Sequence, residues 1–169
     1  GVVGYPECAN TAEDLISGIE YAVSMAKAAS DTNVYYCGHE MLASLRRRRK
    51  IVEILEENLK NNSFSVYYQP IISTATGKYT VAESLLRIPD SPLGPLFPNE
   101  FIPVAEETGM IVEITYQILD KVCKFVNRLS ENGIEFDGVH VNFSGQQFSQ
   151  IGLAEKVEGI IEANHTPFS

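Results

Sequence analysis

Apolar residues recur every three or four positions in several stretches of the chain, and this period is typical of amphipathic helices. The first stretch follows a capping residue, Asn10 or Thr11, and places Ile16, Ile19, Val23 and Ala26 on one side. Further helices are predicted over residues 40–61, 103–107, 111–130 and 147–163. The longer of these carry continuous apolar stripes, so they are expected to pack against other elements.

Alternation with a period of two predicts strands in the second half of the chain. Residues 64–72 and 79–88 alternate on either side of the turn sequence Thr76-Gly77-Lys78, so they are expected to pair as an antiparallel hairpin. A third strand is predicted over Val139–Ser144. From residue 64 the predicted order is β, β, α, α, β, α, which favours an α/β sheet or barrel.

The pattern of apolar residues in residues 1–37 predicts a helix followed by a short strand. A piece of this size is too small to bury its own core, because lone domains below about 40 residues usually need disulfides or metals. The chain also starts at Gly1 and not at Met. We therefore expect the first 37 residues to be the end of a domain that begins upstream.

Composition narrows the class of protein. The chain has 169 residues, 44% of them hydrophobic, and a net charge of −9. This apolar content supports a folded core, and the negative charge argues against nucleic-acid polymers and anionic membranes as partners. Three cysteines without C-x-x-C spacing fit a reduced cytoplasmic setting, and no apolar run reaches the roughly 20 residues of a membrane span. The basic run Arg46–Lys50 is interpreted as a solvated helix surface paired with nearby glutamates.

The candidate chemistry lies on the strands. A period of two puts Val81, Glu83, Leu85 and Arg87 on one face of residues 79–88. Glu83 and Arg87 are either an ion pair that satisfies itself or a metal ligand beside an anion-binding arginine. Asn142, near the end of the third strand, is either a cap or an oxygen donor to the same metal. The three histidines have no metal-ligand spacing.

Four blocks stand in the order and spacing of the EAL domain family, and the chain resembles that family over residues 64–148. The blocks are Tyr67-Tyr-Gln-Pro-Ile71, Glu83-Ser-Leu-Leu-Arg87, Phe101-Ile-Pro-Val-Ala-Glu-Glu-Thr-Gly109 and Val141-Asn-Phe-Ser144. The signature triplet departs from the family, since Ser84 stands where the family has alanine. Residues 1–37 resemble, more loosely, the tail of a GGDEF domain through Gly4-Tyr-Pro-Glu7 and Ala22-x-x-x-Ala26-Lys27.

The resemblance implies a fold and a domain order. Residues 1–37 would be the C-terminal remnant of a GGDEF-like α/β domain, residues 38–62 a connecting helix, and residues 63–169 the N-terminal part of an EAL domain. EAL domains are (β/α)8 TIM-type barrels with an antiparallel first strand, and a whole barrel needs about 250 residues. The expected fold is therefore α/β with an incomplete barrel. Its unpaired strand edge predicts association, so a homodimer is expected.

The resemblance also implies a function. Family members are bacterial phosphodiesterases that linearise cyclic di-GMP to pGpG with Mg²⁺ or Mn²⁺. Glu83 and Asn142 match metal ligands, whereas Gln69, Leu85 and Arg87 match nucleotide contacts. The general base and catalytic lysine are expected beyond residue 169, so the segment alone is expected to be inactive. The alternative is a degenerate GGDEF–EAL protein that acts as a cyclic di-GMP receptor or a protein-interaction module.

Overall fold

The computed structural model describes residues 1–29, 33–134 and 136–166. These residues form two compact units, Gly1–Glu53 and Ile54–Ser169, which we call unit 1 and unit 2. Helix α2 (His39–Asn61) contributes its first part to unit 1 and its last part to unit 2. Within the described ranges, none of the helices combines the length and the apolar character that crossing a bilayer requires.

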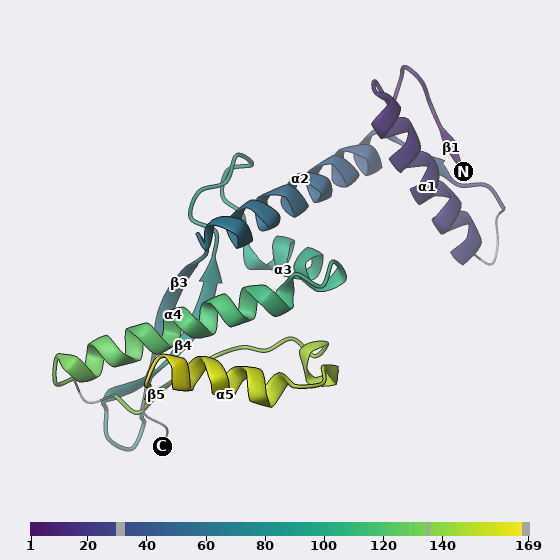
Figure 1. Ribbon diagram of the computed structural model, residues 1–169. Coiled ribbons are helices and arrows are strands. Elements are labelled where there is room, and N and C mark those ends of the chain that lie inside the picture. Colours follow the sequence, from purple (N-terminus) through teal and green to yellow (C-terminus); the bar gives the residue numbers. More distant parts are fainter. Residues whose placement is uncertain (30–32, 135, 167–169) are drawn as a thin grey trace. The chain divides into compact units, whose positions relative to one another are not determined.

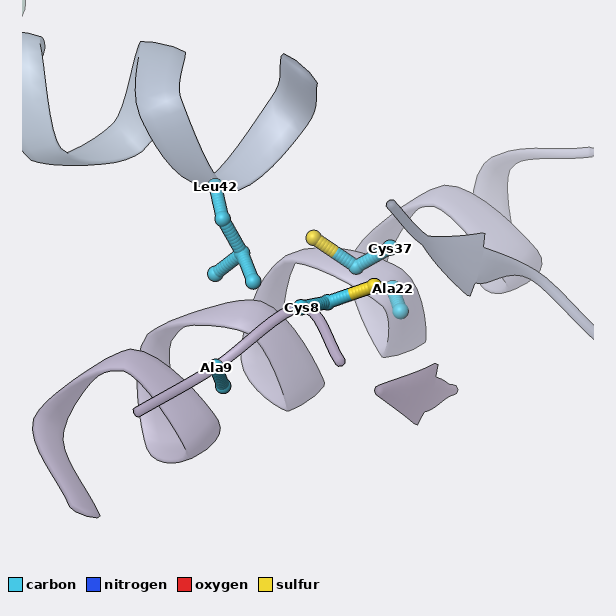
Figure 2. Close-up of a cluster of buried hydrophobic side chains, with 5 residues drawn as sticks. All are labelled: Cys8, Ala9, Ala22, Cys37 and Leu42. Atoms are coloured by element: carbon cyan, nitrogen blue, oxygen red, sulfur yellow. The ribbon is translucent and has the colours of Figure 1, made fainter. Parts of the chain in front are cut away.

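Unit 1 is built around one helix and a small parallel pair of strands. Helix α1 spans Ala12–Ala28, and strands β1 (Val2–Val3) and β2 (Tyr36–Cys37) pair in parallel. Its core is small, as Figure 2 shows, because most of the side chains that fill it are short. The buried residues of this cluster are Cys8, Ala9, Ala22, Cys37 and Leu42.

Two features of unit 1 differ from the sequence predictions. Strand β1 was not expected, and the apolar side predicted for α1 is wrong, because Ile16 and Ile19 are exposed. The helix instead buries Asp14, Gly18 and Ala22. Val3 and Leu42 lie so close to α1 at Gly18 that a larger residue would not fit there. A Cβ on Gly18 would lie 2.9 Å from Val3 Cγ2 and 3.0 Å from Leu42 Cδ2. Small residues therefore mark the packed face. Thr11 caps the helix as expected, accepting a hydrogen bond from Asp14 N.

The basic run in α2 packs partly against α1. Arg46 donates from Nε and Nη2 to the two carboxylate oxygens of Asp14, at 2.8 and 2.6 Å. Arg49 forms an ion pair with Glu13 at 2.8 Å. Lys50 pairs with a nearby glutamate of its own helix, as the sequence predicts, at 2.6 Å from Glu53. The run is thus a helix surface, but one that ties α2 to the first turn of α1.

Unit 2 contains a three-stranded sheet in the order β3-β4-β5, shown in Figure 1. Strands β3 (Ser65–Ile72) and β4 (Tyr79–Arg87) form the predicted antiparallel hairpin, in which Gln69 lies opposite Glu83. Strand β5 (Gly138–His140) pairs in parallel with β4, and His140 lies opposite Glu83. The change from an antiparallel to a parallel pair confirms a mixed α/β arrangement.

Three helices accompany this sheet. Helix α4 (Ile111–Glu131) packs against β3 and β5, α3 (Pro98–Glu107) contacts α4, and α5 (Leu153–Ala163) lies beside α4 in Figure 1. The apolar stripe predicted for residues 111–130 includes Ile114, Ile118 and Val122, and all three are buried. Because β4 and β5 are parallel, the segments that follow these two strands begin at the same edge of the sheet.

The end of α2 is held by α4. Gln117 Nε2 donates to the carbonyl oxygen of Leu59 at 2.9 Å, and Lys121 Nζ donates to those of Asn62 and Phe64, each at 2.7 Å. The last carbonyls of a helix have no partner inside it, so these side chains satisfy them. Burial lowers the pKa of Lys121 from its usual range. This junction fixes where β3 begins.

Three predicted boundaries in unit 2 are wrong. The first helix after the hairpin starts at Pro98 and not at Pro103, because Pro98 occupies the first turn, where a missing N–H costs nothing. The third strand ends at His140, so Val141–Ser144 lie outside it. The last helix is divided into a 3₁₀ turn, η1 (Gln147–Ser149), and α5, with Gly152 at a φ of 84° between them.

Candidate active site

One face of β4 is buried and the other is partly exposed, as the alternation in the sequence predicts. Ala82, Ser84 and Ile88 are buried on one face. Glu83, Leu85 and Arg87 alternate with them and are each half-buried. Gln69 is exposed on β3 directly opposite Glu83, and cross-strand partners in an antiparallel pair share a face. Four of the five predicted site residues thus lie on one face of the hairpin.

The fifth residue, Asn142, reaches the same place from the segment after β5. Its Nδ2 donates a hydrogen bond of 2.7 Å to Oε1 of Glu83. The sequence placed Asn142 inside a strand, whereas in the structure it follows the strand's end by two residues. His140, which the sequence analysis set aside, lies opposite Glu83 in the parallel register and on that face. A carboxylate from β4 and an amide from the segment after β5 therefore meet at the sheet surface.

Arg87 stands next to an aromatic ring and not next to Glu83. Its guanidinium carbon lies 5.8 Å from the centroid of the Tyr67 ring, and its Nη1 donates to the Leu86 carbonyl at 2.8 Å. Tyr67 lies opposite Leu85 in the hairpin register. The Glu83–Arg87 ion pair left open by the sequence is replaced by a Glu83–Asn142 contact. Arg87 keeps further donors for an anion, since a guanidinium carries five N–H groups.

A pocket of about 240 Å³ opens beside these residues. It lies between β4, helices α3 and α4, and the segment after β5, and its lining includes Leu85, Arg87, Glu106, Asn142 and Ser144. A larger pocket of about 670 Å³ lies between β3 and α4 and is lined in part by Lys121, Lys124 and Arg128. None of the predicted site residues borders the larger pocket. Leu85, Arg87 and Asn142 thus border the smaller pocket, whereas Glu83 and Gln69 border neither pocket.

The donors at this site suit a hard divalent cation. The Glu83 carboxylate and the Asn142 side-chain carbonyl both offer oxygen, the ligand type that Mg²⁺ and Mn²⁺ prefer. Among residues 1–29, 33–134 and 136–166 no group of three or more His, Cys, Asp or Glu side chains is placed to hold a metal. The described residues thus offer two oxygen donors whose chemistry suits such an ion.

Ser84 has a hydrogen bond that alanine at this position would lack. Its hydroxyl donates to the carbonyl oxygen of His140 at 2.9 Å from a side chain that is 4% exposed. His140 is the last residue of β5, so this bond supplements the strand pairing where that pairing ends. Ser84 therefore joins β4 to β5 just before Asn142.

Replacing Ser84 with alanine is expected to destabilise unit 2 by about 1 kcal/mol, because a partly buried carbonyl loses its donor. Urea unfolding would show a lower midpoint with an unchanged slope. Ser149→Ala, at an exposed position in η1, is the matched control and should leave the midpoint in place. An unchanged midpoint for Ser84→Ala would mean that this bond contributes nothing to stability.

The sequence did not predict the residues that support the segment carrying Asn142. Gln147 is fully buried, and its Oε1 accepts a 2.8 Å hydrogen bond from Ser144 N. Ser144 Oγ in turn donates to Glu106 Oε1 at 2.7 Å. The available signal was the Ser144-x-x-Gln147 spacing, which is that of a capping box, in which the glutamine bonds the backbone N–H of the serine.

The chain is similar to several known proteins. The EAL domain model matches residues 52–169. A bifunctional diguanylate cyclase/cyclic di-GMP phosphodiesterase of Pseudomonas aeruginosa, MucR, is 27% identical over 161 residues, covering 95% of this chain and 24% of that protein. The signaling protein YkoW of Bacillus subtilis is 36% identical over 116 residues, covering 68% of this chain and 14% of that protein.

The solved structures agree with this match. A PaMucR phosphodiesterase in complex with c-di-GMP is 30% identical and has a TM-score of 0.61, covering 69% of this chain and 47% of that one. The chain thus spans about a quarter or less of these curated relatives and about half of this solved domain. Because the family model covers more than half of the chain, the protein belongs to the EAL domain family.

Proposed function

We propose that the chain is part of a cyclic di-GMP signalling protein whose intact EAL domain hydrolyses cyclic di-GMP to linear pGpG with Mg²⁺ or Mn²⁺. The observation that carries the proposal is the 2.7 Å contact between Asn142 and Glu83 on the sheet face that also bears Arg87. The relative PaMucR, described as a phosphodiesterase in complex with c-di-GMP, supports the same substrate.

Each predicted residue has a role in this proposal. Glu83 and Asn142 hold the divalent cation, which when bound polarises the phosphodiester and activates water for attack. Arg87 binds a phosphate oxygen through its guanidinium, while Gln69 and Leu85 contact the nucleotide. A chain with a net charge of −9 repels a dianionic nucleotide, so positive charge has to be concentrated at the binding site. In this proposal the cation and Arg87 supply that positive charge.

A second candidate function is favoured by the looser match of residues 1–37 to the GGDEF family. A site with Glu83, Asn142 and Arg87 suits nucleotide binding without turnover. The alternative proposal is therefore a degenerate GGDEF–EAL protein that serves as a cyclic di-GMP receptor or a protein-interaction module.

The proposed setting follows from the motifs. Residues 1–37 are the C-terminal remnant of a GGDEF-like domain, residues 38–62 a connecting helix, and residues 63–169 the N-terminal part of an EAL barrel whose other ligands, general base and lysine lie in later strands. An upstream GGDEF domain and a sensor are the proposed partners within the protein, which is placed in the cytoplasm and forms a homodimer. The sheet in unit 2, with its antiparallel and parallel pairs, is compatible with the start of such a barrel.

Replacing Arg87 with alanine is expected to weaken cyclic di-GMP binding at least about tenfold, because a hydrogen bond to a charged group is lost. Isothermal titration calorimetry of the nucleotide into the chain measures this. Arg128→Ala is the matched control, since Arg128 borders the larger pocket, away from Glu83. Equal affinities for wild type and Arg87→Ala would remove Arg87 from the nucleotide site.

The same samples test whether turnover needs residues beyond this chain. With Mg²⁺ or Mn²⁺ added, we expect the isolated 169-residue chain to form no appreciable pGpG, because the other metal ligands, the general base and the lysine of the proposed site lie in later strands. Chromatography of the reaction mixture is the measurement. Metal-dependent production of pGpG by the pure chain would contradict the proposed need for later residues.

A further inference from the structure

The segment that carries Asn142 is anchored outside the sheet. Strand β5 ends at His140, so the ladder to β4 does not hold the residues that follow it. Ser144, two residues after Asn142, is bonded in both directions to Gln147: its N–H donates to Gln147 Oε1 at 2.8 Å, and its carbonyl accepts from Gln147 N at 3.0 Å. The path of the segment that carries Asn142 is therefore fixed by the bonds between Ser144 and Gln147.

Gln147 is itself fixed in place. Its side chain is fully buried, and Thr115 Oγ1 on α4 lies 3.2 Å from its Oε1. Among the described residues its Nε2 has no hydrogen-bond partner. Burying an unpaired amide nitrogen is unfavourable, so the cost of this group offsets part of what the oxygen's bonds contribute to stability. The oxygen of Gln147, and not the amide as a whole, makes the contacts with Ser144.

Glu106 fixes the same serine from a second element. It lies on α3, and its Oε1 accepts a 2.7 Å hydrogen bond from Ser144 Oγ. On the other side of Asn142, the Ser84 hydroxyl donates to His140 O. Asn142 thus sits between two anchored residues, with its Nδ2 2.7 Å from Glu83 Oε1.

We propose that Glu106, Ser144 and Gln147 are positioning residues that hold Asn142 against Glu83 and so set the spacing of the two oxygen donors. This inference rests on the proposed function, in which those donors bind the divalent cation. Partners of metal ligands commonly affect affinity by 10–100-fold although they do not touch the ion. Breaking the network is expected to release the Asn142 side chain while the buried face of β4 stays packed.

The test compares two neighbouring glutamines in the full chain. Gln147→Met removes the acceptor oxygen and keeps the length of the side chain, and Gln146→Met, at an exposed position, is the matched control. Nuclear magnetic resonance of the assigned side-chain NH₂ group of Asn142 reports its hydrogen bond to Glu83. Glu83→Ala supplies the reference for a released asparagine. We expect the Asn142 signals of Gln147→Met to move to the Glu83→Ala position, with those of Gln146→Met unchanged.

Mn²⁺ titration adds a separate readout. Paramagnetic broadening near Glu83 and Asn142 should need about tenfold more Mn²⁺ in Gln147→Met than in wild type. Absence of broadening in wild type would reject the proposed metal site, whereas the NH₂ signals would still decide the positioning role. Asn142 signals that coincide in Gln147→Met and wild type overturn the inference.

A second pair of variants covers the case in which Gln147→Met does not fold. Glu106→Gln keeps an acceptor oxygen for Ser144 Oγ, and Glu106→Leu does not. Wild-type Asn142 signals in the glutamine variant and displaced signals in the leucine variant support the network. Identical signals in both variants overturn it.

Discussion

If the intact parent protein is the proposed phosphodiesterase, Glu83→Ala is expected to lower its metal-dependent hydrolysis of cyclic di-GMP by about a thousandfold or more. Loss of a carboxylate ligand removes charge stabilisation worth several kcal/mol, and about 4 kcal/mol corresponds to this factor. The fold should survive, because Glu83 alternates with the buried Ala82 and Ser84 and takes no part in the face that packs. Formation of pGpG in the presence of Mn²⁺, followed by chromatography, measures the effect.

The control for this variant is Glu158→Ala on α5, which removes an exposed carboxylate and should leave turnover at the wild-type level. Calorimetry on the same proteins distinguishes the two candidate functions. A parent protein that binds cyclic di-GMP but shows no turnover even as wild type would favour the receptor. Undiminished turnover in Glu83→Ala would exclude Glu83 from the metal site.

The sequence predicts correctly which residues share a face of β4, because strand alternation is a local property. A period of two places Glu83, Leu85 and Arg87 on one face without any knowledge of the rest of the fold. The hairpin turn then brings Gln69 opposite Glu83. What the residues bind to could not be predicted in this way, since Arg87 lies near Tyr67 and Glu83 accepts from Asn142, a residue 59 positions away.

The segment after β5 was mispredicted for a physical reason. Val141 and Phe143 continue the alternation of β5, so the pattern alone extends the strand to Ser144. In the structure Asn142 bonds to a side chain of β4, and Ser144 bonds to Gln147. Polar side chains that bond locally compete with a strand ladder, and here they end it.

Hydrophobic periodicity predicts the wrong packed face for helix α1. The pattern counted large apolar residues and selected Ile16 and Ile19, yet the packed face consists of Gly18, Ala22 and the charged Asp14. Small residues allow the close approach of Val3 and Leu42 at Gly18. The cation that accompanies Asp14 comes from Arg46, 32 residues later, so no rule based on neighbours along one helix could assign it.

Among substitutions of partly exposed side chains in unit 1, Arg46→Leu is expected to lower the stability of the unit most. The substitution leaves the carboxylate of Asp14 buried without a cation. Asp14 is 5% exposed, and both of its oxygens accept hydrogen bonds from Arg46. Removing one partner of such a pair costs much more than the intact pair contributes. We expect the melting temperature of unit 1 to fall by several degrees, as followed by its amide signals in nuclear magnetic resonance.

Acid provides the sharper test of this pair. The hydrogen bonds from Arg46 hold the pKa of Asp14 well below its usual value of 3.8. Because the folded pKa is the lower one, the unfolded chain binds the proton more readily, so stability is fully present above about pH 4 and is lost as the pH falls further. In Asp14→Asn this loss should be absent, which flattens the acid profile of unit 1. Glu13→Gln, in the exposed pair with Arg49, should keep the wild-type slope. Identical acid profiles for wild type and Asp14→Asn would show that this ion pair does not govern the acid stability of unit 1.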